Sequence, residues 1–174
     1  MILLGVPVLA GALLLIVAGL EHLRDPAALA RAASTGIGTA WVIALAELAI
    51  GAPSVAAVLL GIPPLRWALV AQALTYLVFA IHLLRRRRRG DESDCGCHRM
   101  GTRVGPGGIA RAWALAILTF AAAALSPPAI SPGGTGGLTL VIVAAAVLAT
   151  LLYALPAAVD GPPAPGRPAH GGSS

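Results

Sequence analysis

Residues 2–23 read ILLGVPVLAGALLLIVAGLEHL, and this stretch decides the fold class. It carries no charged side chain before Glu21, and it has the length of about 20 mainly apolar residues that a bilayer crossing requires. Four further apolar segments follow, at about 39–62, 65–84, 109–125 and 138–155. Because lipid offers the backbone no hydrogen bonds, each segment is predicted to be a helix. The sequence therefore predicts an all-α, polytopic transmembrane helical bundle of four to five spans.

The composition agrees with a membrane protein. Hydrophobic residues make up 57% of the chain, charged residues only 11%, and the mean hydropathy is +0.86. Soluble domains carry about 25% charged residues. The net charge is +5, and all twelve basic residues are arginines. No soluble basic domain is present to bind nucleic acid, so we expect membrane lipid and no nucleic acid as a partner.

The chain divides into a membrane domain and a tail. We expect the helical domain to cover residues 1–159, with an Arg/Cys loop at 85–108 between the third and fourth spans. Asp25 followed by Pro26 is an N-cap signature, which predicts a short interfacial helix after the first span. Residues 160–174 are rich in Pro, Gly and Ser, a composition that predicts a disordered tail.

The arginines indicate how the chain crosses the membrane. Seven of them lie in the segment 85–103, and Arg24 and Arg31 follow the first span, whereas residues 126–137 carry no charge. Positive charge accumulates on the cytoplasmic side. With five spans, the N-terminus is expected outside and the Arg-rich Cys loop in the cytoplasm. We expect a multi-pass protein of the cell inner (plasma) membrane.

Cys95 and Cys97 are the two cysteines of the chain, and they flank Gly96 in a polar segment. Glycine lets the backbone bend so that the sulfurs can meet, and a disulfide across so few residues is strained and easily reduced. His98 and the nearby arginines favour the thiolate, although three acidic residues oppose it. The pattern predicts a redox pair, Cys95 and Cys97, assisted by His98. A soft-metal site of these three side chains and an incidental pair are the alternatives.

A second set of ionisable residues belongs to the spans. Glu47 lies roughly 12 Å into the second span at 1.5 Å per residue and needs a cationic partner, or else it stays protonated. Arg24 and Arg111 lie at the same membrane face in this topology, and either can reach it. Glu21 and His22 end the first span at that face. These five residues predict a structural ion pair or a proton-handling site.

Several of these residues resemble the MauE branch of the DoxX-like redox-associated integral membrane proteins. Residues 18–26 resemble the family's opening segment, and residues 45–51 resemble its Glu-centred second helix. The Cys95-Gly96-Cys97 pair matches part of a Cys-Gly-Cys-Phe-Gly signature, in which residues 98–101 replace the Phe-Gly. Arg111 matches an arginine that follows in the family. The resemblance covers about residues 19–113.

The resemblance implies a DoxX-like bundle and a role in methylamine utilisation or a related redox-maturation task. It implies that the chain helps to mature the disulfide-rich small subunit of methylamine dehydrogenase, with a thioredoxin-like partner. No second cysteine pair exists in this chain, so another protein or a membrane quinone would have to take the electrons.

Two function classes without thiol chemistry compete with this hypothesis. One is a non-enzymatic membrane scaffold or assembly factor, in which the cysteines are dispensable. The other is a small transporter with Glu47 on a polar path. The many Ala and Gly residues also allow the spans to pack as a homodimer.

Overall fold

The computed structural model describes residues 2–33, 35–60, 66–90, 105–125 and 134–160. Over these residues the chain forms six helices: α1 (Ile2–Arg24), α2 (Pro26–Ala32), α3 (Ile37–Leu60), α4 (Arg66–Arg88), α5 (Pro106–Leu125) and α6 (Gly134–Asp160). All except α2 are long and apolar enough to cross a membrane. The structure thus confirms the all-α polytopic bundle and gives it five spans.

Several helix boundaries differ from the prediction, and three of these differences change the loops and the tail. The helix α4 continues to Arg88, so Arg85–Arg88 form its last turn and are not part of a loop that starts at residue 85. Arginine is a good helix former, and cations are favoured at the negative end of the helix dipole. The helix α5 begins earlier, at Pro106, because proline suits the first helical position. The helix α6 extends to Asp160, and the expected disordered tail after it lies outside the described residues.

The short helix α2 forms where the sequence predicts it. Its N-cap is Asp25, whose Oδ1 accepts a hydrogen bond of 2.9 Å from the backbone N–H of Ala28. Pro26 occupies the first helical position, and Leu29 is the buried residue of this helix. The helix therefore lies with one apolar side against the bundle, between the ends of α1 and α3.

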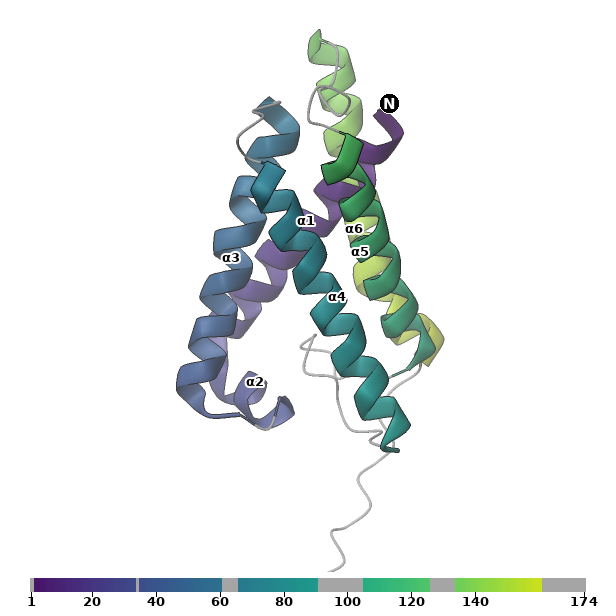
Figure 1. Cartoon of the computed structure of the whole chain (residues 1–174). Coiled ribbons are helices and arrows are strands. Elements are labelled where there is room, and N and C mark those ends of the chain that lie inside the picture. Colours follow the sequence, from purple (N-terminus) through teal and green to yellow (C-terminus); the bar gives the residue numbers. More distant parts are fainter. Residues whose placement is uncertain (1, 34, 61–65, 91–104, 126–133, 161–174) are drawn as a thin grey trace, which may run out of the picture.

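The spans alternate in direction along the chain, and α1 occupies the centre (Figure 1). It packs against α3, α5 and α6, while α4 packs against α5 and α3. The helices α3 and α4 lie closest where residues 60 and 66 are joined by a short connection, and they separate toward the end of the bundle that carries α2 (Figure 1). One half of the bundle is therefore tightly packed and the other is more open.

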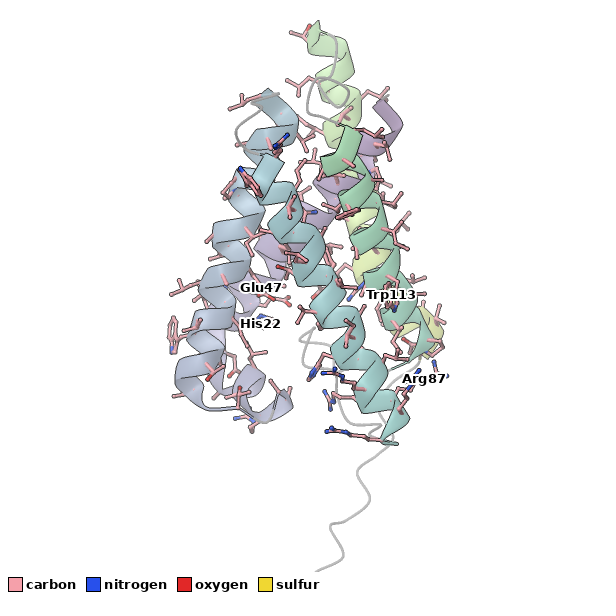
Figure 2. The ribbon with its side chains drawn as sticks, in the orientation of Figure 1. His22, Glu47, Arg87 and Trp113 are labelled. Carbon is pink, nitrogen blue, oxygen red and sulfur yellow. The ribbon has the colours of Figure 1, made fainter. Side chains whose placement is uncertain are left out.

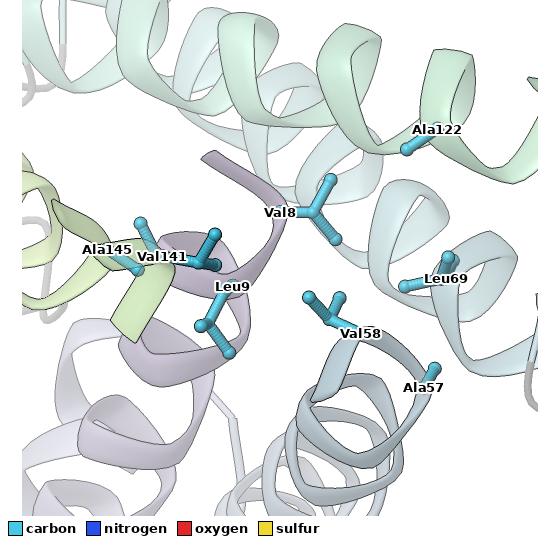
Figure 3. Close-up of a cluster of buried hydrophobic side chains, with 9 residues drawn as sticks. Val8, Leu9, Ala57, Val58, Leu69, Ala122, Val141 and Ala145 are labelled. Atoms are coloured by element: carbon cyan, nitrogen blue, oxygen red, sulfur yellow. The ribbon is translucent and has the colours of Figure 1, made fainter. Parts of the chain in front are cut away.

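The tightly packed half holds the larger apolar core (Figure 3). Side chains from α1, α3, α4, α5 and α6 meet there: Val8, Leu9, Ala10, Ala57, Val58, Leu69, Ala122, Val141 and Ala145. Small residues also let α1 and α3 approach closely. A Cβ at Gly51 of α3 would lie 3.0 Å from the carbonyl oxygen of Ala12, and one at Gly19 of α1 would lie 2.9 Å from that of Ala44.

Two polar side chains of α4 bind the backbone of α1. The Gln72 Nε2 group donates to the carbonyl oxygen of Val8 at 3.0 Å, and it lies 3.4 Å from Thr119 Oγ1 of α5. The Tyr76 hydroxyl donates to the carbonyl oxygen of Gly11 at 2.6 Å. A hydrogen bond inside a membrane spares a polar group from contact with hydrocarbon. These contacts fix the position of α4 relative to the central helix.

Candidate functional site

A cavity of about 570 Å³ lies in the more open half of the bundle, next to α2. Most of its wall is aliphatic or aromatic, with side chains such as Leu14, Ile43, Ile50 and Phe79. Each of the five spans also contributes at least one polar side chain: His22, Glu47, Thr75, Tyr76, His82, Arg111 and Tyr153. The cavity is therefore the place where the ionisable groups of separate spans come together inside the apolar bundle.

His22 and Glu47 form a hydrogen-bonded pair across the α1–α3 interface. The His22 Nδ1 atom lies 2.7 Å from Glu47 Oε2, and their side chains are only 11% and 15% exposed. Glu47 is ten residues from the start of α3, which is about 15 Å along a helix. Figure 2 shows the two side chains meeting between α1 and α3. The partner that the structure gives Glu47 is thus His22, whereas Arg24 is exposed at the end of α1.

A second polar contact joins α1 to α6. The hydroxyl of Tyr153 donates a hydrogen bond of 2.8 Å to Glu21 Oε1. The other carboxylate oxygen, Oε2, is buried and finds no hydrogen-bond partner among the described residues. An unpaired buried oxygen is costly if the carboxylate is ionised. This oxygen can therefore accept a hydrogen bond from a donor group of a bound molecule.

Arg111 enters the same cavity from α5. It is buried, and its guanidinium donates a hydrogen bond of 2.8 Å to the carbonyl oxygen of Leu152 in α6. The next residue, Tyr153, is the one that binds Glu21. Arg111 and Tyr153 therefore hold α5, α6 and α1 in register around the cavity.

The chemistry open to this cluster is proton exchange and hydrogen bonding. A histidine and a carboxylate 2.7 Å apart share a proton whether the pair is written as ions or as neutral groups. In a medium of low dielectric constant their mutual attraction is strong, so the pair is stable only while both partners are present. Such a pair can exchange a proton with a molecule bound in the cavity.

The structure places three of the predicted site residues, His22, Glu47 and Arg111, on the wall of one cavity. Glu21 is not on that wall but accepts a hydrogen bond from Tyr153, which is. Arg24 lies outside it, on the exposed end of α1. Cys95, Cys97 and His98 lie outside the described residues, and so does the alternative metal site built from them. The predicted redox pair therefore remains a prediction from the sequence.

Sequence reasoning missed two tyrosines and an aspartate. The chain has only two tyrosines, and both Tyr76 and Tyr153 line the cavity. A hydroxyl within an apolar span needs a partner, and this signal could have found them. Asp160 accepts hydrogen bonds from the backbone N–H groups of Gly107 at 3.0 Å and Gly108 at 3.1 Å. Nothing in the sequence pairs residue 160 with the start of α5.

A protein-family comparison identifies the chain. The family described as methylamine utilisation protein MauE matches residues 1–126. The chain belongs to the MauE family. Comparison with curated proteins and with solved structures gave no match. This chain is therefore a MauE-type multi-pass membrane protein of methylamine utilisation.

The part of the chain that matches the MauE family contains some of the site residues and leaves out others. It contains His22, Glu47, Arg111 and the Cys95/Cys97 pair, all within residues 1–126. Tyr153 and Asp160 belong to α6, which lies beyond that range. The contacts that close the cavity from the α6 side are therefore contributed by a part of the chain outside the MauE match.

Proposed function

We propose that this MauE-type protein performs thiol–disulfide exchange through Cys95 and Cys97 and so supports the maturation of a partner protein in methylamine utilisation. The observation that carries the proposal is the Cys-Gly-Cys pair inside the part of the chain that matches MauE. His98, the residue after the second cysteine, favours its thiolate. A thioredoxin-like protein is the proposed exchange partner, because such proteins present a dithiol to a disulfide.

The described residues on either side of the cysteine segment lie at the cavity end of the bundle. Cys95 follows Gly90 at the end of α4 by five residues, and Cys97 precedes Gly105 at the start of α5 by eight. An extended chain spans at most about 3.6 Å per residue, so the limits are about 18 Å from Gly90 and about 29 Å from Gly105. Both anchors adjoin helices whose residues line the cavity, through His82 and Arg111. This supports a functional link between the thiols and the cavity.

The orientation belongs to the same proposal. Among the described residues, Arg24, Arg31 and Arg85–Arg89 lie at the ends of α1, α2 and α4 that adjoin the cavity, whereas Arg66 starts α4 at the opposite end. Figure 2 shows Arg87 at this end. By the positive-inside rule this end faces the cytoplasm of the inner membrane. The thiols would then meet a cytoplasmic thioredoxin-like partner.

The test is the redox state of the thiols in membranes. Cells are grown under oxidising and reducing conditions, and free thiols are tagged with an alkylating reagent that shifts the protein on a gel. We expect Cys95 and Cys97 to change between two-tag and no-tag forms with growth condition. The Cys95→Ser/Cys97→Ser variant should insert normally and lose support of partner maturation. Thiols that stay reduced under every condition contradict the proposal.

A membrane scaffold is the second candidate, and specific contacts favour it. The His22–Glu47 and Glu21–Tyr153 hydrogen bonds join α1 to α3 and α6 and can serve packing alone. In that case Cys95→Ser/Cys97→Ser retains full function, whereas substitutions at His22 or Glu47 reduce function in proportion to the stability they remove. The double cysteine variant therefore separates the two candidates in one experiment.

A further inference from the structure

The cavity combines a largely apolar wall with a hydrogen-bonded pair of ionisable side chains. Its walls are largely apolar, and its volume of about 570 Å³ lies in the range of about 300–1,000 Å³ typical of sites for small organic molecules. A proton-exchanging pair, His22 and Glu47, nevertheless lies on its wall about 15 Å along α3. An apolar ring with polar substituents fits such a site better than a pure hydrocarbon chain does.

The electrons and protons released by disulfide formation restrict which kind of ring molecule can occupy the cavity. Closing a disulfide from two thiols releases two electrons and two protons. The chain has two cysteines in all, so it offers no second disulfide to receive them. The acceptor must therefore be a separate molecule that takes up two electrons and two protons. Within a membrane, the acceptor must also be lipophilic.

We propose that the cavity binds the ring of an isoprenoid quinone, which accepts the electrons of the Cys95/Cys97 pair. This inference rests on the proposed thiol–disulfide function and names its electron acceptor. The apolar side chains of α1, α3 and α4 enclose the ring, and its carbonyl oxygens face the polar side chains contributed by α1, α5 and α6. The prenyl tail lies along the apolar side chains that α3 and α4 contribute to the cavity wall, such as Ile43 and Phe79.

Oxidation of the cysteine pair by the quinone transfers equal numbers of electrons and protons. Two thiols, on Cys95 and Cys97, lose two protons and two electrons and form one sulfur–sulfur bond. The quinone gains the same two electrons and two protons and becomes a quinol. A dithiol on the thioredoxin-like partner then reduces the new disulfide and is itself oxidised. His22 and Glu47 are the proton-exchanging groups of the wall, and the cavity keeps the ring away from bulk water.

The experiment measures quinone binding directly, without any turnover. The full chain is purified in detergent and titrated with decylubiquinone as the probe, by equilibrium dialysis. Ala46 of α3 lines the cavity, whereas Ala49 is an exposed residue of the same helix that does not line it. We expect Ala46→Trp to fill the cavity and weaken binding at least tenfold. Ala49→Trp, the matched control, should bind like the unaltered chain.

Several outcomes overturn the inference. Equal Kd values for the Ala46→Trp and Ala49→Trp variants would place the probe elsewhere, and so would binding that excess phospholipid abolishes, because the cavity would then be a lipid site. A second measurement avoids dependence on folding of the tryptophan variants. A photoreactive quinone should crosslink to peptides of α3 or α4 in the unaltered chain, and crosslinking confined to other helices contradicts the site.

Failure of the inference can be told apart from failure of the proposed function. The Cys95→Ser/Cys97→Ser variant should bind decylubiquinone as the unaltered chain does, because no cysteine lines the described cavity wall. Thiols that cycle in cells while the probe does not bind refute the quinone site alone. Probe binding together with thiols that never oxidise refutes the proposed function and, with it, the role of the bound quinone as electron acceptor.

Discussion

The hydrogen bond between His22 and Glu47 links two ionisable groups that neither helix could bury alone. The two side chains lie 2.7 Å apart and are little exposed, so each supplies a hydrogen bond that water would otherwise provide. We expect His22→Ala to lower the free energy of unfolding by about 3 kcal/mol, the low end of the range for breaking a buried pair, because Glu47 then loses its hydrogen-bond partner. Reversible unfolding in mixed detergent micelles measures this loss.

A double-mutant cycle is the control for this pair. If His22 and Glu47 act on each other, the His22→Ala/Glu47→Ala variant should be less destabilised than the sum of the single variants, by at least about 0.5 kcal/mol. Additive losses of stability would mean that the two side chains contribute independently and that the interaction energy between them is close to zero.

Asp160 performs for α5 the role that an N-cap usually performs within one helix. Its two carboxylate oxygens accept from the N–H groups of Gly107 and Gly108, where the helix dipole favours negative charge. We expect Asp160→Ala to cost about 1 kcal/mol, as loss of a cap does. Amide hydrogen exchange at residues 107 and 108 should accelerate. Asp160→Asn, which keeps one acceptor oxygen, should be intermediate, and unchanged exchange in both variants would contradict the capping role.

Glycine at the start of α5 leaves room for that carboxyl group. A Cβ at Gly105 would overlap the side chain of Asp160, and one at Gly107 would lie 3.1 Å from its Oδ2. The segment Gly105-Pro106-Gly107-Gly108 therefore combines a helix-starting proline with the open space that a carboxylate from α6 requires. Side-chain partners of this kind depend on three-dimensional proximity over fifty residues of chain, which no local pattern encodes.

At the scale of helices, the sequence predicted most of what the structure contains. Long apolar segments specify spanning helices because lipid leaves the backbone no other way to form its hydrogen bonds. The Asp25-Pro26 pair specified α2 by local capping chemistry. The predicted spans ended at residues 84 and 155, before the observed helix ends at Arg88 and Asp160. The prediction assumed that a helix ends where its apolar residues end. Arginines and a terminal aspartate remain helical when they reach water or a partner.

The partner of Glu47 shows where such prediction stops. Charge and topology made Arg24 and Arg111 the expected cations, because arginine is always charged. The structure places His22 against Glu47 as a hydrogen-bond partner that the sequence did not indicate, because α1 and α3 approach closely at Gly19 and Gly51. Position along a span is readable from the sequence, but the rotation of one helix against another depends on small residues whose contacts are not local.

That close approach gives a prediction at the scale of the α1–α3 pair. A methyl group at Gly51 would lie 2.9 Å from Ile16 Cγ1 and 3.0 Å from the backbone oxygen of Ala12. We expect Gly51→Ala to force the helices apart and destabilise the bundle by about 1–3 kcal/mol, as overpacking does. Gly38 of the same helix has no described atom within 4 Å of such a methyl group. Gly38→Ala should therefore be neutral or stabilising by a few tenths of a kcal/mol, because alanine favours helix.

Detergent unfolding of both variants measures the difference. Equal stabilities of Gly51→Ala and Gly38→Ala would show that the α1–α3 contact tolerates an added methyl group. In that case backbone proximity would not be what aligns His22 with Glu47.

On the scale of the whole molecule, the tightly packed apolar core and the cavity lie at opposite ends of the bundle. Val8, Val58 and Leu69 pack the end that carries the N-terminus, whereas the cavity and its ionisable side chains occupy the end that carries α2 and the arginines. A fully packed end holds the spans together, so the other end can stay hollow. The polar end also carries the covalent anchors of the cysteine segment, Gly90 and Gly105.

The concentration of arginines at one end of the bundle predicts which side of the membrane each end faces. In the Cys95→Ser/Cys97→Ser background, one cysteine is placed at Arg89, which follows α4, or at Thr135 near the start of α6; both positions are exposed. An impermeant thiol reagent should label the Thr135→Cys variant in intact cells and the Arg89→Cys variant only in inverted vesicles, because the positive end stays in the cytoplasm. Exchanged labelling would reverse the orientation and place the natural cysteines outside. Labelling of both positions from one side would refute the five-span arrangement, since residues 89 and 135 are separated by a single span, α5.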